Sequence, residues 1–265
     1  YNGADGMLHQ LSNNKAYPTV FEGEGALEER GLMITDGLDA YVDLTLDVLE
    51  AFGIKVDRSF SEDGFEVYKI AGNQRYIEPD GLTVEGDWSN GSFWLVCGAL
   101  GGSVTVRGLD MESSQRDKYI IDVLKLMGAD IVIGDGITVT APNGLEGAEV
   151  SVAQTPDMVP VLAAAMALAK GSSMITNAER LKIKESDRLK TVYDFLRKLG
   201  ADITYGGSGL SLTGKGRLAG GEVDSHNDHR IAMSFAIASL LADGPMTIID
   251  KNCVDISFPS FYQDL

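Results

Sequence analysis

One pattern of apolar and polar positions occurs three times along the 265-residue chain. In each copy an apolar helix end leads through a glycine into a strand, over residues 47–56, 122–131 and 194–203. The glycines at positions 53, 128 and 200 stand where a left-handed helix C-cap is expected. A second short strand should follow each copy, over residues 65–70, 137–140 and 210–212. Because 75 and then 72 residues separate the copies, the pattern predicts long supersecondary units rather than a solenoid of small ones.

The other half of the repeat is a strand, a polar turn and a strongly apolar helix. The helices are expected over residues 93–100, 158–169 and 231–242. A strand and its turn precede them, over residues 83–89, 149–157 and 221–230, and a strand follows, over residues 103–107, 173–176 and 246–250. Helices that are apolar on nearly all sides are normally buried. The pattern therefore predicts an α/β (α+β) fold of repeated βαβαββ units, with the helices inside and the sheets outside.

A cluster of charged residues, 182–188, precedes an amphipathic helix in which apolar residues recur at three- and four-residue steps over 189–199. From Glu179 to Lys198 there are seven Lys or Arg and four acidic side chains, a net charge of +3 in a chain of formal charge −17. A small anionic substrate would require such a positively charged segment, because the negative electrostatic field of the whole chain repels it. A solvated helix face with many ion pairs is the alternative interpretation.

The composition is that of a globular protein, with 44% apolar and 8% aromatic residues. An isoelectric point near 4.5 argues against a nucleic-acid or anionic-membrane partner. Cys97 and Cys253 are too few and too far apart for a disulfide framework. No apolar run has membrane-spanning length and the N-terminus has no signal-peptide pattern, so a reducing, cytoplasmic setting is expected.

Three polar motifs stand at predicted helix starts, where partial positive charge and free N–H donors favour a phosphate or carboxylate. The groups available for acid–base chemistry or for clamping an anion are Asp157, Glu185, Asp187, Asp228, Lys184, Arg188 and Arg230. Taken singly, Asp157 and Asp228 are also typical helix caps, with Thr155 and Asn227 as alternative caps. His226 and His229 have the spacing of metal ligands, but no third ligand is apparent. Together the motifs predict a small anionic substrate and general acid–base chemistry.

At these residues the sequence resembles the 5-enolpyruvylshikimate-3-phosphate synthase family, also called 3-phosphoshikimate 1-carboxyvinyltransferase. The motifs are Thr155-Pro-Asp-Met158, Ile183-Lys-Glu-Ser-Asp-Arg-Leu189, Asn227-Asp-His-Arg-Ile-Ala-Met233 and Cys253-Val-Asp-Ile-Ser-Phe-Pro259. Their order and spacing match the C-terminal part of that family over roughly residues 38–265. The resemblance implies an enolpyruvyl transferase-like fold, an inside-out α/β barrel of βαβαββ units with parallel buried helices and outer sheets.

The resemblance also implies a reaction of the shikimate pathway, in which aromatic amino acids are made. The enolpyruvyl group of phosphoenolpyruvate is transferred to the 5-hydroxyl of shikimate 3-phosphate, and inorganic phosphate is released. By resemblance, Asp157 is the base that takes the hydroxyl proton and Glu185 is the acid–base partner of the methylene carbon. Lys184 is implied in catalysis and in contact with the substrate hydroxyl or the phosphate of phosphoenolpyruvate.

The same resemblance implies a set of substrate-binding residues: Lys184, Arg188, Asp228, His229 and Arg230. Of these, the two arginines are implied to hold the carboxylate of phosphoenolpyruvate, because the planar guanidinium favours bidentate contact. The expected partners are small anionic substrates, with no nucleic acid and no membrane. No metal and no cofactor is expected.

The match is partial, and it suggests how the chain is divided. Residues 1–36, where only 17–21 looks like a strand, stay unassigned; 37–80 resemble the end of the family's N-terminal domain, and 81–265 resemble its C-terminal domain. The family's N-terminal Lys-Ser…Arg and Gly-Asn-Ala-Gly-Thr segments are absent. Ser113-Ser-Gln115 spells the tripeptide that binds the shikimate phosphate, but its place in the repeat predicts a coincidence. Ile256 stands where many members have a phosphate-binding Lys.

Three functional interpretations stay open from the sequence. The first is an active short synthase, in which self-association or the unassigned segment 1–36 supplies the missing half of the cleft. The second is a non-catalytic or split-enzyme domain that binds phosphoenolpyruvate and needs a partner chain. The third is a relative of the UDP-N-acetylglucosamine enolpyruvyl transferases, which is disfavoured because Cys97 and Cys253 lie in apolar or strand-end contexts rather than in an exposed loop.

Overall fold

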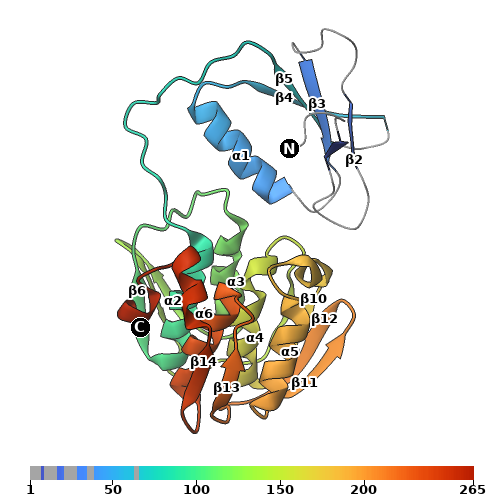
Figure 1. Cartoon of the computed structure of the whole chain (residues 1–265). Coiled ribbons are helices and arrows are strands. Elements are labelled where there is room, and N and C mark those ends of the chain that lie inside the picture. The colour runs from blue at the N-terminus through green and yellow to red at the C-terminus, as the bar shows by residue number, and fades with distance from the viewer. Residues whose placement is uncertain (1–6, 9–16, 21–28, 35–38, 63–65) are drawn as a thin grey trace. The chain divides into compact units, whose positions relative to one another are not determined.

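The computed structural model describes residues 7–8, 17–20, 29–34, 39–62 and 66–265 (Figure 1). The chain divides into two compact units, residues 1–84 and residues 85–265, and each is described by itself. Within the described residues, no helix is both long enough and apolar enough to cross a membrane.

The described residues of the first unit form one helix and an antiparallel sheet. The helix is α1 (Asp39–Ala51), and the strands are β1 (Met7–Leu8), β2 (Tyr17–Val20), β3 (Glu29–Ile34), β4 (Val56–Phe60) and β5 (Glu66–Ala71). Their order in the sheet is β1-β2-β3-β5-β4. The strands predicted over 17–21 and 65–70 are confirmed as β2 and β5, except that Phe21 and Phe65 lie outside the described residues.

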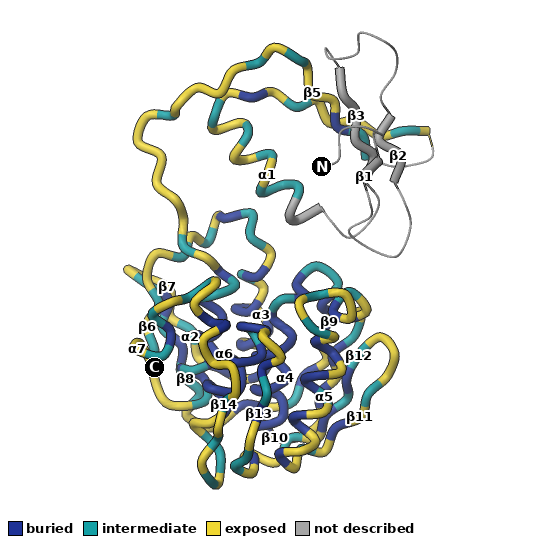
Figure 2. The backbone as a smooth tube through the Cα atoms, in the orientation of Figure 1, coloured by how far each residue is buried: buried dark blue, intermediate teal, exposed yellow. Residues whose placement is uncertain are grey.

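The core of the second unit is built from apolar helices that pack on one another. These are α2 (Trp88–Gly101), α4 (Val159–Leu168) and α6 (His229–Ala238), and α5 (Arg188–Lys198) packs beside α4. All ten residues of α4 are buried, as Figure 2 shows for the centre of this unit. The shorter helices are η1 (Arg116–Tyr119), α3 (Ile120–Leu126), η2 (Pro156–Met158), η3 (Glu179–Ile183), η4 (Ser239–Leu241), η5 (Lys251–Ile256) and α7 (Phe261–Asp264).

Three sheets lie outside these helices. An antiparallel sheet, ordered β6-β8-β7, consists of β6 (Ser103–Val106), β7 (Asp130–Ile133) and β8 (Ile137–Thr140). A sheet ordered β11-β12-β10-β9 consists of β9 (Glu149–Ser151), β10 (Lys170–Thr176), β11 (Asp202–Gly206) and β12 (Gly209–Lys215), with β9 and β10 parallel. The parallel pair is β13 (Gly221–Asp224) and β14 (Met246–Ile249).

Each sheet packs against one apolar helix: the first on α2, the second on α4 and the third on α6. Alternate residues of β12 point inward and are buried, which is the pattern of a sheet with one face exposed to solvent. The prediction of buried helices with outer sheets is confirmed.

The glycines predicted as C-caps have the left-handed backbone that this role needs. Gly53, Gly128 and Gly200 have φ of +78°, +89° and +84°. A residue with a Cβ atom is strained at such angles, whereas glycine is not. Each glycine therefore turns the chain from a helix into the next strand, as the repeat predicted.

The prediction of a strand within 83–89 is wrong. Residues 82–87 form no strand, and a hydrogen bond of 2.9 Å from Gly86 N to Gly108 O joins this segment to its neighbour. A strand needs a ladder of such bonds along a paired partner. The third apolar helix also differs, because α6 begins two residues earlier than expected, at His229, and gives way to η4 after Ala238.

Candidate functional site

The starts of α4, α5 and α6 meet around the guanidinium group of Arg188, whose side chain is 1% exposed. Its Nε and Nη2 donate to the two carboxylate oxygens of Asp228, at 2.7 and 3.2 Å. Its Nη1 donates to Asp157 Oδ1 at 2.8 Å, and its Nη2 donates to Glu185. One buried cation therefore joins carboxylates that precede three different helices.

Asp228 has two structural roles at once. It is the N-cap of α6, accepting from the backbone N of Arg230 at 3.0 Å, and it is fully buried. Its side chain also accepts from Arg188 and from the Ser186 hydroxyl, the latter at 3.0 Å. The interpretation of Asp228 as a helix cap is confirmed, and capping is only part of what the side chain does.

Asp157, by contrast, does not cap a helix. Thr155 occupies the N-cap position of η2 without a capping hydrogen bond from its side chain, and Met158 occupies that of α4. The carboxylate of Asp157 instead faces Lys184 Nζ at 3.2 Å, Arg188 Nη1 at 2.8 Å and Arg230 Nη2 at 3.6 Å. The interpretation of Asp157 as a cap is wrong, because Thr155 takes the N-cap position of η2 and Asp157 lies in the first turn.

The charges around Asp157 determine its ionisation. Burial would raise the pKa of Asp157, but the cations Arg230, Lys184 and Arg188 outweigh burial and lower the pKa to about 2. The carboxylate is therefore ionised at neutral pH. A carboxylate held this way is a weak base until its cations are drawn elsewhere.

The remaining charged groups differ in their access to solvent. The side chain of Glu185 is 49% exposed and that of Lys184 is 26% exposed. Arg230 is more deeply placed, and its Nη1 is buried with no hydrogen-bond partner among the described residues. Glu185 and Lys184 thus lie at the accessible side of the cluster, while Arg230 offers a donor within it.

The two histidines of the third motif lie in different environments. His229, the first residue of α6, is buried; burial and Arg230 lower its pKa, so the ring is mainly neutral at pH 7. His226 is half exposed, has a left-handed backbone (φ 51°) and lies against the ring of Phe195. Within the described residues, no cluster of three or more His, Cys, Asp or Glu has the geometry to hold a metal ion.

Asp117 is a residue near this cluster that the sequence reasoning missed. It lies in η1, is 7% exposed, and accepts a hydrogen bond from the Ser89 hydroxyl. Burial raises its pKa to about 6, while Ser89 and Arg230 oppose that rise. In the sequence, Asp117 is a charged residue between Arg116 and Lys118, next to a helix start. Taken by itself, that pattern is typical of a solvated turn.

The tripeptide 113–115 has a structural role in the second unit. Gln115 accepts from the backbone N of Trp88 at 2.8 Å and donates to Gly86 O at 2.9 Å, so it closes the start of α2. The backbone N of Gln115 donates to the Ser113 hydroxyl at 3.0 Å. These hydrogen bonds give the Ser113 and Gln115 side chains a structural role that involves no ligand.

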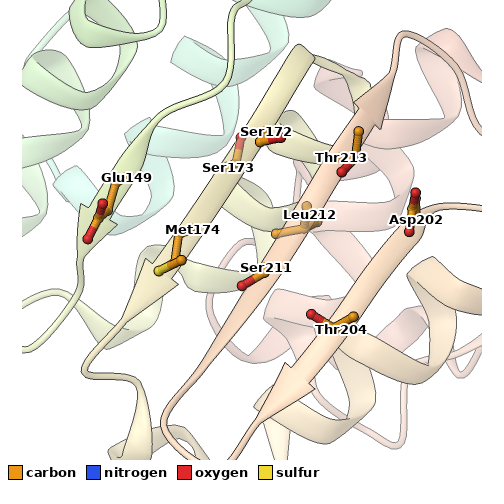
Figure 3. Close-up of a pocket in the computed structure, with 9 residues that line it drawn as sticks. All are labelled: Glu149, Ser172, Ser173, Met174, Asp202, Thr204, Ser211, Leu212 and Thr213. Atoms are coloured by element: carbon orange, nitrogen blue, oxygen red, sulfur yellow. The ribbon is translucent and has the colours of Figure 1, made fainter.

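A hollow of about 320 Å³ on the sheet β11-β12-β10-β9 shares no lining residue with this cluster (Figure 3). It is lined by Glu149, Ser172, Ser173, Met174, Asp202, Thr204, Ser211, Leu212 and Thr213. Two of these nine residues are acidic and none is basic, so the hollow does not suit an anionic ligand.

Comparison with known proteins agrees with the motifs. Residues 19–265 match the family model described as EPSP synthase (3-phosphoshikimate 1-carboxyvinyltransferase). The chain belongs to the EPSP synthase family. It is 43% identical over 235 residues to the 3-phosphoshikimate 1-carboxyvinyltransferase of Clostridium novyi, covering 88% of this chain and 53% of the relative.

More distant relatives give the same result. The enzyme of that name from Methanococcus maripaludis is 38% identical over 229 residues, which are 86% of this chain and 53% of the relative. The EPSP synthase structure from Acinetobacter baumannii superposes with a TM-score of 0.72 at 30% identity, covering 89% of this chain and 56% of that one. The chain therefore spans about half the length of the relatives that it matches, and it shares their fold.

Proposed function

We propose that this chain provides acid–base and anion-binding groups for transfer of the enolpyruvyl group of phosphoenolpyruvate to the 5-hydroxyl of shikimate 3-phosphate. The supporting observation is the carboxylate of Asp157 held among three cations, Lys184, Arg188 and Arg230, in a chain of net charge −17. The N–H donors of these cations can hold the phosphate and carboxylate of an anionic substrate that the net charge of the chain repels. The family to which the chain belongs supports the choice of substrates.

In the proposed addition step, the hydroxyl oxygen forms a bond to C2 of phosphoenolpyruvate. Asp157 takes the hydroxyl proton, and Glu185 delivers a proton to C3, which becomes a methyl group. In the elimination step, Glu185 takes a proton back from that methyl group and the C2–O bond to phosphate breaks. Inorganic phosphate leaves with the bonding electron pair and takes up the proton that Asp157 had accepted. Each carboxyl group thus acts at one reacting atom, and the proton count balances.

Asp157 must become a stronger base before it can take that proton, since a pKa of about 2 leaves it weakly basic. The phosphate and carboxylate of a bound substrate would draw the positive charge of Lys184 and Arg230 away from it. Its basicity would then rise when the substrate is in place. The chemistry would be coupled to binding in this way.

The two arginines differ in their fitness to hold a carboxylate. Arg188 already donates to Asp228, Asp157 and Glu185, and it would have to release a partner to bind an anion. Arg230 has a buried Nη1 without a hydrogen-bond partner in the described part of the chain. We therefore place Arg230 in direct contact with the carboxylate of phosphoenolpyruvate, and Arg188 in ordering the carboxylates around it.

The domain assignment belongs to the same proposal. Residues 37–80 would correspond to the end of the relatives' N-terminal domain and residues 81–265 to their C-terminal domain. The chain spans about half the length of those relatives. A second copy or a partner chain that supplies further substrate contacts stays a prediction. The alternative is a non-catalytic or split-enzyme domain that binds phosphoenolpyruvate alone. A cytoplasmic setting stays a prediction.

The first test is phosphate release by the purified chain. Release is expected only when phosphoenolpyruvate and shikimate 3-phosphate are both present, and it should be lost in Asp157→Asn. Asp194→Asn is the matched control, because Asp194 is half exposed and pairs with Lys190 on the outer side of α5. Equal release by Asp157→Asn and the unaltered chain would contradict the role of Asp157.

Calorimetric titration with phosphoenolpyruvate separates the two interpretations when no phosphate is released. Binding at millimolar concentrations that is lost in Arg230→Gln would support the split-enzyme alternative. Absence of both turnover and binding would contradict both functions.

A further inference from the structure

Asp117 is a buried carboxyl group that the proposed chemistry leaves unused. It is 7% exposed, and it accepts a hydrogen bond from Ser89 in the first turn of α2. The Gln115 bonds that close the start of α2 lie two residues away. The position of Asp117 is therefore set by its bond to Ser89 and by the hydrogen-bonded turn that precedes it.

The elements around Asp117 bring further charges toward it. Its own 3₁₀ helix, η1, packs on α2, and α2 packs in turn on η2 and on α6. The charged groups that interact with its carboxyl group are Arg230 from α6, Asp157 from η2 and Asp87, the N-cap of α2. Asp117 is thus electrostatically part of the candidate site, although no direct hydrogen bond links it to Arg230.

Arg230 is the cation that these carboxylates share. Its Nη2 lies 3.6 Å from Asp157 Oδ2, which is a loose ion pair, and its buried Nη1 has no hydrogen-bond partner among the described residues. A guanidinium placed in this way can donate to an incoming anion. A second negative charge nearby weakens its attraction for that anion.

We propose that Asp117 is a positioning residue whose charge sets how strongly Arg230 attracts an anionic ligand. This inference rests on the proposed function, in which Arg230 contacts phosphoenolpyruvate. When Asp117 is ionised, it shares the positive charge of Arg230; when it is protonated, that charge is available to the ligand. Because its pKa is about 6, the change falls between pH 5 and pH 8, where binding can be measured.

The test compares the dissociation constants of phosphoenolpyruvate for the unaltered chain and for Asp117→Asn, measured by calorimetry from pH 5 to pH 8. Asn keeps the shape and the acceptor for Ser89 but removes the charge. A coupling of about half to one pKa unit corresponds to roughly three- to tenfold tighter binding by Asp117→Asn above pH 7. At pH 5 the two constants should be nearly equal, because Asp117 is then mostly protonated.

The ratio of the two constants is the informative quantity. Protonation of phosphoenolpyruvate and of His229 changes both proteins alike, so these effects cancel in the ratio. The control is Asp135→Asn, which removes the charge of a side chain that is 98% exposed and should give a ratio near one. A ratio of one for Asp117→Asn at every pH would overturn the proposal. A ratio that differs from one but does not change with pH would also overturn it, because it would indicate a merely structural role of Asp117.

A second measurement does not depend on ligand binding. Carbon-13 NMR of the Asp117 carboxyl group should show a higher pKa in Arg230→Gln than in the unaltered chain, because Arg230 favours the ionised form. An unchanged pKa would overturn the proposal by removing the link between the two residues. If the link is present but phosphoenolpyruvate does not bind, the proposed function fails and the ligand-tuning role of Asp117 fails with it, whereas the charge coupling stands.

Discussion

Arg188 is the residue on which the candidate site depends most. Its buried guanidinium donates to Asp157, Glu185 and Asp228. A buried ion pair is weak support for net stability, yet removing one partner is costly because it leaves an uncompensated buried charge. Asp228 is fully buried, so its carboxylate would be left without its strongest partner.

We expect Arg188→Met to lower the free energy of unfolding by about 3–5 kcal/mol, the usual effect of breaking a buried pair. Urea unfolding followed by circular dichroism measures the change. Lys190→Met is the control, since Lys190 pairs with Asp194 in solvent and its loss should leave the unfolding midpoint nearly unchanged. A similar small effect for Arg188→Met would show that the buried network contributes little in solution.

Close packing of a helix on a sheet explains why one position of the second unit is a glycine. At Gly98, in the last turn of α2, an added Cβ atom would lie 2.7 Å from Val139 O and 3.0 Å from Val104 N. Both contacts are backbone atoms of β8 and β6, which cannot move aside as a side chain can. The helix therefore approaches this sheet more closely than any larger residue allows.

We expect Gly98→Ala to destabilise the second unit by about 1–3 kcal/mol, the range found for overpacking, although Ala is the better helix former. Thermal unfolding gives the comparison. Gly101→Ala is the matched control at the end of the same helix, where the new Cβ would meet only the end of the flexible Leu240 side chain at 3.3 Å. If both variants unfold at the same temperature, α2 and its sheet are less tightly packed than described.

At the scale of the whole molecule, the chain consists of two units joined by a stretch without regular structure. Residues 72–87 form no helix or strand, and Leu82 and Val84 are exposed by 53% and 89%. The apolar helices and their sheets all lie after this stretch. A unit with its own hydrophobic core is expected to survive separation from its neighbour.

Limited digestion with thermolysin, which cuts before apolar residues, should therefore begin at Leu82 or Val84 and leave a resistant fragment that extends to Leu265. Mass spectrometry identifies the fragment. Replacing both residues by Asp should slow the first cut and leave later cuts unchanged. First cuts inside residues 88–265 would contradict the independence of the second unit.

The repeat and its elements were predictable from sequence because they depend on local patterns. Glycines at 53, 128 and 200 turn the chain at helix ends, and the apolar runs predicted buried helices. The strand expected within 83–89 failed for a physical reason. A strand exists only through its hydrogen-bonded neighbour, and the sequence does not state whether one is present.

The motifs also named most of the residues that now lie together, since Asp157, Lys184, Arg188, Asp228 and Arg230 were all candidates. Only the tertiary structure decided their relations. It made Asp228, a cap expected from sequence, a partner of Arg188 as well, and it turned Asp157 away from capping toward three cations. It also brought Asp117 near Arg230, 113 residues further along the sequence. Burial and long-range charge arise when distant segments pack, so a local pattern predicts which residues are available and the fold decides what each one meets.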